Sequence, residues 1–296
     1  MSAILRTQRV YNRMTTIKSI LFPVDFSPPC VAMAAFVRKG VALFSAKVTL
    51  LHVLELASSG YELMVRPLKE VERDREQVAR ARLEAFLEAE FPLTECPRLL
   101  RVGDAATRIA ELARERRFDL IVMPTHAGAF RRMLLGSTTA KVLNDAGCPV
   151  LTTQHAETIA PRPLEHREWV CALGLHADSE RVLRYASGLA ETAHANLSLI
   201  HAIPAGEPGL DLELDERVQS AEKQIARRRL AELQAKVGSQ ARVGIAVGPI
   251  KDALTGAARR LQADVLIIGR SPQADVRLRD LTYAVVRDAP CPVLSV

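Results

Sequence analysis

Short apolar runs alternate with longer amphipathic segments along the chain. Runs such as SILFPVD (residues 19–25) and KVTLLHV (47–53) are rich in Val, Ile and Leu, which is typical of strands buried on both faces. The segments between the runs repeat apolar residues at helical spacing, as in the stripe of Ile109, Leu112 and Ala113. Short strands that alternate with helices predict βαβ units. Right-handed crossovers then give an α/β fold, with an open parallel sheet and helices on both of its faces.

The alternation also predicts where each element lies. In the first half of the chain we expect strands at 19–25, 47–53, 97–102, 119–123 and 149–153, and helices at 31–44, 64–90, after Gly103–Asp104, and at 138–146. In the second half we expect strands at 169–173, 197–202, 242–247, 265–268 and 292–296, and helices at 180–193, 212–237, 250–261 and 281–288.

The two halves of the chain repeat one another. KVTLLHV recurs as NLSLIHA, FDLIVMP as ADVLIIG, and GCPVLTT as PCPVLSV, so that His52 matches His201 and Asp119 matches Asp264. Three matches in the same order, at slowly drifting offsets, indicate a duplicated domain. The polar, Pro-containing stretch between the copies predicts a linker. We therefore expect a basic N-terminal tail at 1–16, a first domain at 17–153, a linker at 154–167 and a second domain at 168–296.

Composition narrows the class of protein. The chain has 296 residues, enough for two domains that each bury a core, and 48% of them are apolar. No apolar run approaches the roughly 20 residues of a membrane helix, so we expect no membrane partner. The N-terminal segment has arginines but no apolar core, so it does not read as a signal peptide, and Met14 is an alternative start to Met1.

Charge and cysteine usage argue against a specific nucleic-acid-binding protein and against a fold held by disulfides or zinc. The net charge of +6 raises nucleic acid as a partner. The arginines, however, alternate with glutamates in residues 69–90 and 215–236, which is typical of solvated helix faces. We therefore expect no specific nucleic-acid partner. The five cysteines are odd in number and form no Cys-x-x-Cys pair, which argues against disulfide or zinc frameworks and favours a cytoplasmic location.

Four motifs resemble those of the universal stress protein family. They are ILFPVDFSPP (residues 20–29), LLHVLE (50–55), GDAATRIAELARERRFDLIVMPTH (103–126) and LLGSTTAKVLNDAGCPVL (134–151). The chain is similar to a tandem member with two UspA-type domains. The resemblance implies two flavodoxin- or Rossmann-like, doubly wound domains, each with a five-stranded parallel sheet of order 3-2-1-4-5. It also implies that the two domains pair through their fifth strands.

The resemblance and the sheet order together predict a nucleotide site in the first domain. Ligands of open α/β sheets bind beyond the carboxyl ends of the strands, where the strand order reverses. There, Asp25 follows the first strand and is placed to accept a hydrogen bond from a ribose or an amino group. The helix that opens at Gly136–Ser137 offers backbone N–H groups and its positive dipole end to phosphate. Ser137, Thr138 and Thr139 would add hydroxyl donors.

The match to the family's ATP-binding motif is incomplete. ATP-binding members carry Gly-x-x-Gly, nine residues, and then Gly-Ser or Gly-Thr. Here Pro124 and Ala127 replace the two glycines, and eight residues separate Ala127 from Gly136. The implied ligand is ATP or AMP, with or without Mg²⁺. The implied contact residues are Pro23, Asp25, Val53, Met123, Pro124, His126, Ala127, Gly136, Ser137, Thr138 and Thr139.

Each singled-out residue also has a structural interpretation. Ser137 is a good N-cap without any ligand, and Asp25 is a common turn former. His126 and Arg131–Arg132 are typical of exposed loops, although the arginines would reach a phosphate. His52 and His201 end buried strands, which favours a role as core histidines.

The second copy is predicted to have lost the site. Arg279 and Asp280 stand at the positions of Gly136 and Ser137, and Gly174 stands at the position of Asp25. At the start of the predicted helix 281–288, the Asp280 carboxylate would cap the amides and repel phosphate. We therefore expect domain 2 to be a structural partner whose last strand pairs with that of domain 1. A homodimer is a further candidate assembly.

Three functions remain open from the sequence. The first is a stress-response protein regulated by an adenine nucleotide bound in domain 1. The second is an interaction and dimerisation module in which Pro124 and Ala127 have abolished nucleotide binding. The third is a slow ATPase, against which stand the absence from the sequence of a Walker motif and of paired carboxylates in the predicted crevice. We expect a binding protein rather than an enzyme.

Overall fold

The computed structural model describes residues 16–55, 68–125, 135–154, 156–157, 160–163, 167–205, 212–270 and 276–296. They form two compact units, one made mainly of residues 17–152 (domain 1) and the other mainly of residues 162–296 (domain 2). Among the described residues, no helix combines the length and the apolar character needed to cross a membrane.

Domain 1 is a doubly wound α/β domain. Its elements are β1 (Ser19–Pro23), α2 (Pro28–Phe44), β2 (Lys47–Leu54), α4 (Leu68–Ala85), β3 (Arg98–Val102), α5 (Ala105–Glu115), β4 (Leu120–Pro124), α6 (Ser137–Asp145) and β5 (Val150–Thr153). The strands lie in the order β3-β2-β1-β4-β5, and β1 pairs in parallel with both β2 and β4. This is the predicted order 3-2-1-4-5.

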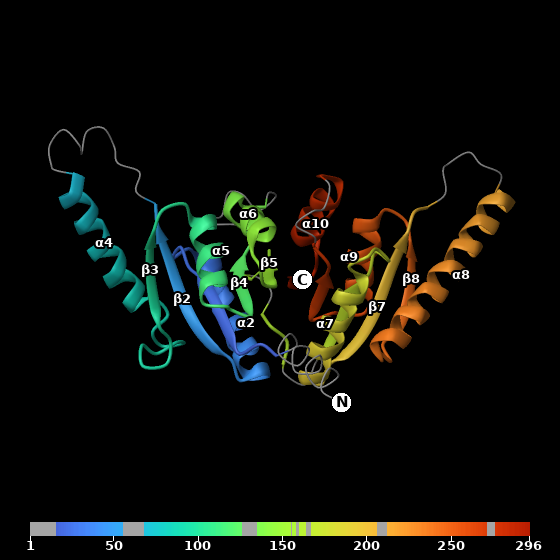
Figure 1. Ribbon diagram of the computed structural model, residues 1–296, viewed down its shortest axis with the longest axis horizontal. Coiled ribbons are helices and arrows are strands. Elements are labelled where there is room, and N and C mark those ends of the chain that lie inside the picture. The colour runs from blue at the N-terminus through green and yellow to red at the C-terminus, as the bar shows by residue number, and fades with distance from the viewer. Residues whose placement is uncertain are drawn as a thin grey trace, which may run out of the picture. The chain divides into compact units, whose positions relative to one another are not determined.

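Domain 2 repeats the architecture of domain 1. Its elements are β6 (Glu168–Ala172), α7 (Ser179–Thr192), β7 (Asn196–Ile203), α8 (Leu212–Val237), β8 (Arg242–Val247), α9 (Ile250–Arg260), β9 (Val265–Ile268), α10 (Val276–Asp288) and β10 (Val293–Ser295). Read from β8, the strands lie in the order β8-β7-β6-β9-β10, which is 3-2-1-4-5 when counted within the domain. In Figure 1, α4 lies beside β3 in domain 1 and α8 lies beside β8 in domain 2. The predicted fold class is confirmed.

The sheet cores are aliphatic, as the composition predicts. Ile20, Leu21 and Phe22 of β1 are fully buried, and so are Leu50 and Leu51 of β2. Burial on both faces explains why these strands read as continuous apolar runs.

Matched aspartates fasten the start of the first strand in both domains. In domain 1, Asp119 Oδ2 accepts hydrogen bonds from the backbone N–H groups of Lys18 and Ser19, both at 2.9 Å, and from the Ser19 hydroxyl at 2.8 Å. In domain 2, Asp264 Oδ2 accepts from the Glu168 N–H at 2.8 Å. The repeat of Asp119 as Asp264 therefore has a structural reason, because each carboxylate joins its domain's first strand to the fourth.

Two predicted helix boundaries are wrong. The helix predicted at 64–90 ends at Ala85, and Leu87 adopts a left-handed backbone with φ 54° that stops it. The helix predicted at 281–288 begins at Val276. Asp280 therefore lies inside α10, and the prediction that it caps the helix start is also wrong.

Candidate functional site

A cavity of about 220 Å³ lies at the carboxyl ends of β1, β2 and β4 in domain 1. Its lining includes residues of α2, α5 and the start of α6, so six elements meet there. The position agrees with the rule that ligands of open α/β sheets bind where the strand order reverses, here between β1 and β4. The predicted contact residues that line the cavity are Pro23, Asp25, Val53, Met123, Pro124, Gly136, Ser137, Thr138 and Thr139.

The N-terminus of α6 opens onto this cavity. Gly136 is the N-cap, has an extended backbone, and carries no side chain that could cap the helix. The first helical hydrogen bond runs from the Ala140 N–H to the Gly136 carbonyl at 2.9 Å. The N–H groups of Ser137, Thr138 and Thr139 therefore have no acceptor within the helix. Three amide donors and the positive end of the helix dipole meet at one wall of the cavity.

Two details of this helix start differ from expectation. Ser137 is the first helical residue rather than the N-cap, so its interpretation as a capping residue is wrong. The Thr139 hydroxyl donates to the Pro124 carbonyl at 3.0 Å and is buried, which leaves the proton of that hydroxyl unavailable to a ligand. Of the three predicted hydroxyl donors, those of Ser137 and Thr138 remain.

Asp25 has the predicted role of a turn former and lies at the cavity where a ligand is expected. Its Oδ1 accepts from the Ser27 N–H at 3.0 Å and from the Cys30 thiol at 3.0 Å, which fixes the turn between β1 and α2. Its Oδ2 makes no hydrogen bond to the part of the chain that the structure describes. The exposed carboxylate thus keeps one oxygen free to accept from a ligand at the mouth of the cavity.

His52 is a half-buried wall of the cavity rather than a core histidine. Its Nδ1 lies 2.8 Å from the Val24 carbonyl oxygen. Because a carbonyl can only accept, Nδ1 carries the proton, and in the neutral ring Nε2 is an acceptor. The Phe26 ring lies against His52 with 4.3 Å between ring centroids. His201 makes the matching contact in domain 2, at 2.7 Å from the Leu173 carbonyl.

Six lining residues are not among the predicted contact residues, namely Val24, Cys30, Leu51, His52, Ala105 and Ile109. Ile109 was assigned to the apolar stripe of its helix, and that stripe packs toward the sheet just where the cavity begins. No motif marks Cys30, which enters the site through the first turn of α2. Two predicted contact residues, His126 and Ala127, lie outside the described residues, as do Arg131 and Arg132.

The buried thiols should resist alkylation. Burial, followed by the Asp25 carboxylate, raises the pKa of the Cys30 thiol, and burial raises the pKa values of Cys171 and Cys291 to about 12. The thiolate is the reactive form, so we expect iodoacetamide at about pH 8 to leave these three thiols unmodified in the folded protein. Peptide mass spectrometry would measure this, with guanidinium-unfolded protein as the control in which all five cysteines react. Modification of Cys171 in the folded protein would contradict the prediction.

Comparison with known proteins assigns both halves of the chain. The sequence model of the universal stress protein family matches residues 16–154 and again residues 167–296. The chain belongs to the universal stress protein family. It is a tandem member, because one family match falls on each structural repeat.

Individual relatives agree with this universal stress protein assignment. A curated universal stress protein of Thermus aquaticus, from the 3′ region of a QAH/OAS sulfhydrylase gene, is 33% identical over 140 residues, which covers 45% of this chain and 96% of the relative. A universal stress protein of Archaeoglobus fulgidus has a similar structure with a TM-score of 0.66 at 19% identity, over 95% of this chain and 96% of that one. A putative universal stress protein of Pseudomonas aeruginosa gives 0.61 at 20% identity, over 96% and 94%. At these identities the two structures support the fold alone.

Proposed function

We propose that domain 1 binds an adenine nucleotide, ATP or AMP, as a regulatory ligand of a cytoplasmic stress-response protein. The observation that carries the proposal is the uncapped start of α6, whose first three amides have no acceptor within the helix and face a cavity at the switch point of the sheet. An anion is the ligand that such a helix start favours. The free Oδ2 of Asp25 adds an acceptor for a ribose hydroxyl or an amino group.

The size of the cavity suggests how the nucleotide lies. At about 220 Å³ it falls below the roughly 300–1,000 Å³ of pockets that enclose a whole drug-sized ligand. It would take the base between the apolar side chains of Val53, Met123 and Ile109. The phosphates would then extend along the amides of residues 137–139, with or without Mg²⁺.

A second candidate function follows from Pro124. Proline has no N–H to donate, and it stands where ATP-binding members have the first glycine of their motif. In that case the chain would act as an interaction module through its paired domains or as a homodimer. Neither the pairing of the fifth strands nor homodimerisation is needed for the nucleotide proposal.

A calorimetric titration separates the two candidates. We expect the purified chain, freed of bound nucleotide, to bind ATP at one site per chain, and we expect denatured samples of the untreated protein to release adenine nucleotide detectable by mass spectrometry. Titration with and without Mg²⁺ would define the bound form. Absence of binding by both ATP and AMP would favour the interaction module, whereas two sites per chain would place nucleotide in domain 2 as well.

A further inference from the structure

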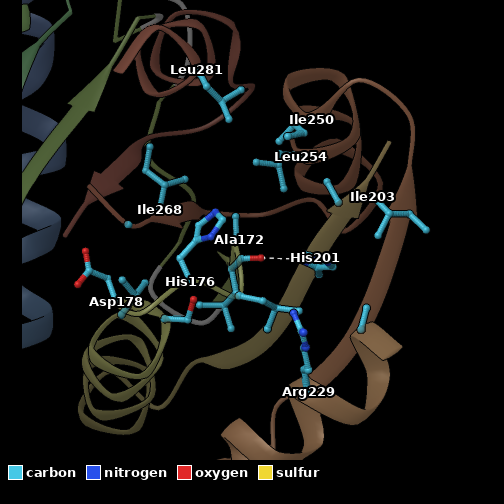
Figure 2. A pocket seen from close by; sticks show the side chains of 18 of the residues that line it. Ala172, His176, Asp178, His201, Ile203, Arg229, Ile250, Leu254, Ile268 and Leu281 are labelled. Carbon is cyan, nitrogen blue, oxygen red and sulfur yellow. Dashed lines mark hydrogen bonds between the residues drawn. The ribbon is translucent and has the colours of Figure 1, made fainter. Parts of the chain in front are cut away.

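Domain 2 contains a larger cavity than the candidate nucleotide site of domain 1. Its volume is about 950 Å³, and it lies at the carboxyl ends of β6, β7 and β9 (Figure 2). Helices α7, α8, α9 and α10 also contribute side chains to its wall. The volume is near the upper end of the roughly 300–1,000 Å³ typical of small-molecule pockets.

One side chain distinguishes this cavity from the two hollows found among the described residues of domain 1. These hollows, of about 220 and 490 Å³, share Asp25 and His52 as lining residues. The Phe26 ring lines the larger hollow and packs against His52, and the Arg82 guanidinium lies over that ring at 4.4 Å from its centroid. Domain 2 has Leu175 at the matching position, with the same left-handed backbone (φ 56° against 64° for Phe26). Without the ring, the equivalents of both hollows form one cavity.

Among its described residues, the cavity of domain 2 lacks the groups that are predicted to contact a nucleotide in domain 1. Because α10 begins at Val276, residues 280–282 lie beyond its first turn, and their N–H groups donate to carbonyls within the helix. These residues match Ser137, Thr138 and Thr139 of domain 1. The carboxylate of Asp25 is also missing, since Gly174 takes its place. A Cβ at Gly174 would lie 2.6 Å from the His176 ring, so the ring occupies space that any larger residue would need.

The wall of the cavity is mainly aliphatic. Figure 2 shows Ile203, Ile250, Leu254, Ile268 and Leu281 arranged around it, and Ile225 of α8 lines it as well. Ile225 and Ile250 are 45% and 40% exposed, which is high for large apolar side chains in the wall of a cavity. A ligand with an apolar body would cover them.

Arg229 in the cavity wall of domain 2 lacks the aromatic ring on which its counterpart Arg82 lies in domain 1. Arg229 of α8 occupies the position of Arg82, but no ring lies beneath it, and among the described residues it makes no hydrogen bond, ion pair or ring contact. The carboxylate of Glu222, on the same helix, lies two turns earlier, about 10 Å along the axis. Asp178 lies on the α7 side of the cavity in Figure 2, whereas Arg229 lies on the α8 side. The α8 side at Arg229 is therefore where an anionic group would be accepted.

We propose that domain 2 binds an elongated apolar monocarboxylate, with its carboxylate paired to Arg229 and its hydrocarbon body along the aliphatic wall between α9 and α10. The carboxylate is favoured over phosphate because the amides of residues 280–282, which match the phosphate-facing amides of domain 1, are satisfied within α10, and because a guanidinium pairs well with a planar carboxylate. This site is separate from the nucleotide site of domain 1 and does not depend on it.

Titration with decanoate and with decanol tests the proposal. We expect decanoate to bind the full chain at one site, whether or not ATP is present, and to raise its thermal unfolding temperature. Arg229→Gln should weaken decanoate binding about tenfold while leaving decanol binding unchanged. The matched control is Arg228→Gln, because Arg228 is a neighbouring, 73% exposed arginine that contacts Glu232 and does not line the cavity.

A second variant tests the location. Leu175→Phe restores the ring that domain 1 carries at φ 64°, so the backbone tolerates it, and it should reduce binding of both decanoate and decanol at least tenfold. Decanoate binding that Leu175→Phe leaves unchanged would overturn the location. No decanoate binding at all would overturn the site, and equal loss of decanoate affinity in Arg228→Gln and Arg229→Gln would overturn the role of Arg229.

Discussion

Ser137→Asp should reduce ATP affinity about 100-fold while leaving the protein folded. Ser137 is exposed and is the first residue of α6. A carboxylate there would stand beside the phosphates and occupy the amides that would bind them. Two like charges 4 Å apart repel by about 1 kcal/mol in water and by about 4 kcal/mol near a protein surface, and 2.8 kcal/mol is about 100-fold in affinity. Calorimetric titration with ATP would measure the loss.

We expect Ser137→Asp to leave the stability of the protein unchanged or slightly raised. An acidic residue in the first turn of a helix stabilises it by about 0.3–1 kcal/mol, so the variant should unfold at the same temperature as the natural protein or slightly above. Asn144→Asp is the matched control, since it makes the same charge change two turns later in α6, away from the cavity. If Ser137→Asp binds ATP as tightly as the natural protein does, the phosphates do not lie at this helix start.

Asp119→Ala should lower the free energy of unfolding of domain 1 by about 2–4 kcal/mol. The carboxylate accepts three hydrogen bonds from Lys18 and Ser19, and its loss leaves the start of β1 without these acceptors. Urea unfolding followed by circular dichroism would measure the effect. The single tryptophan, Trp169 of β6, reports on domain 2 by fluorescence and should show a smaller change.

Two further variants serve as comparisons for Asp119→Ala. Asp119→Asn keeps one carbonyl acceptor and should cost less than Asp119→Ala. Asp145→Ala removes an exposed carboxylate at the C-terminal end of α6, where a negative charge is not favoured by the helix dipole, and should cost nothing measurable. A loss below about 0.5 kcal/mol for Asp119→Ala, the range of ordinary surface substitutions, would show that the carboxylate does not fasten the strand.

Most of the fold could be predicted, because it depends on local hydrophobic patterns that occur in both halves of the sequence. Buried parallel strands must be apolar on both faces, so each appears as a continuous run, and the repeat of those runs identifies the duplication. The boundaries that failed depend on less regular features. The end of α4 is marked by the left-handed backbone of Leu87, an apolar residue that carries no turn signal. The early start of α10 extends a helix into a stretch that lacks an apolar stripe.

The site was predictable only where a motif carried it. The residues at the ends of β1 and β4 and at the start of α6 belong to family motifs, and the described ones line a common cavity. Cys30 belongs to no such motif, and Ala105 and Ile109 lie in a family motif without being predicted contact residues, since all three reach the cavity through the packing of α2 and α5 on the sheet. The hydrogen bond from Thr139 to Pro124 joins residues that are distant along the chain. No sequence-spacing rule predicts this hydrogen bond.

The sequence by itself determined that this protein is a duplicated α/β protein with a helix start suited to an anion in its first half. The physical reason is that strand burial, helix amphipathicity and the Gly-Ser helix start are properties of neighbouring residues. Only the tertiary structure showed that the second half contains a large cavity. There Leu175 replaces Phe26, Gly174 lies close to the His176 ring, and α10 begins before residues 280–282, and the domain that was predicted as a structural partner contains a large apolar cavity.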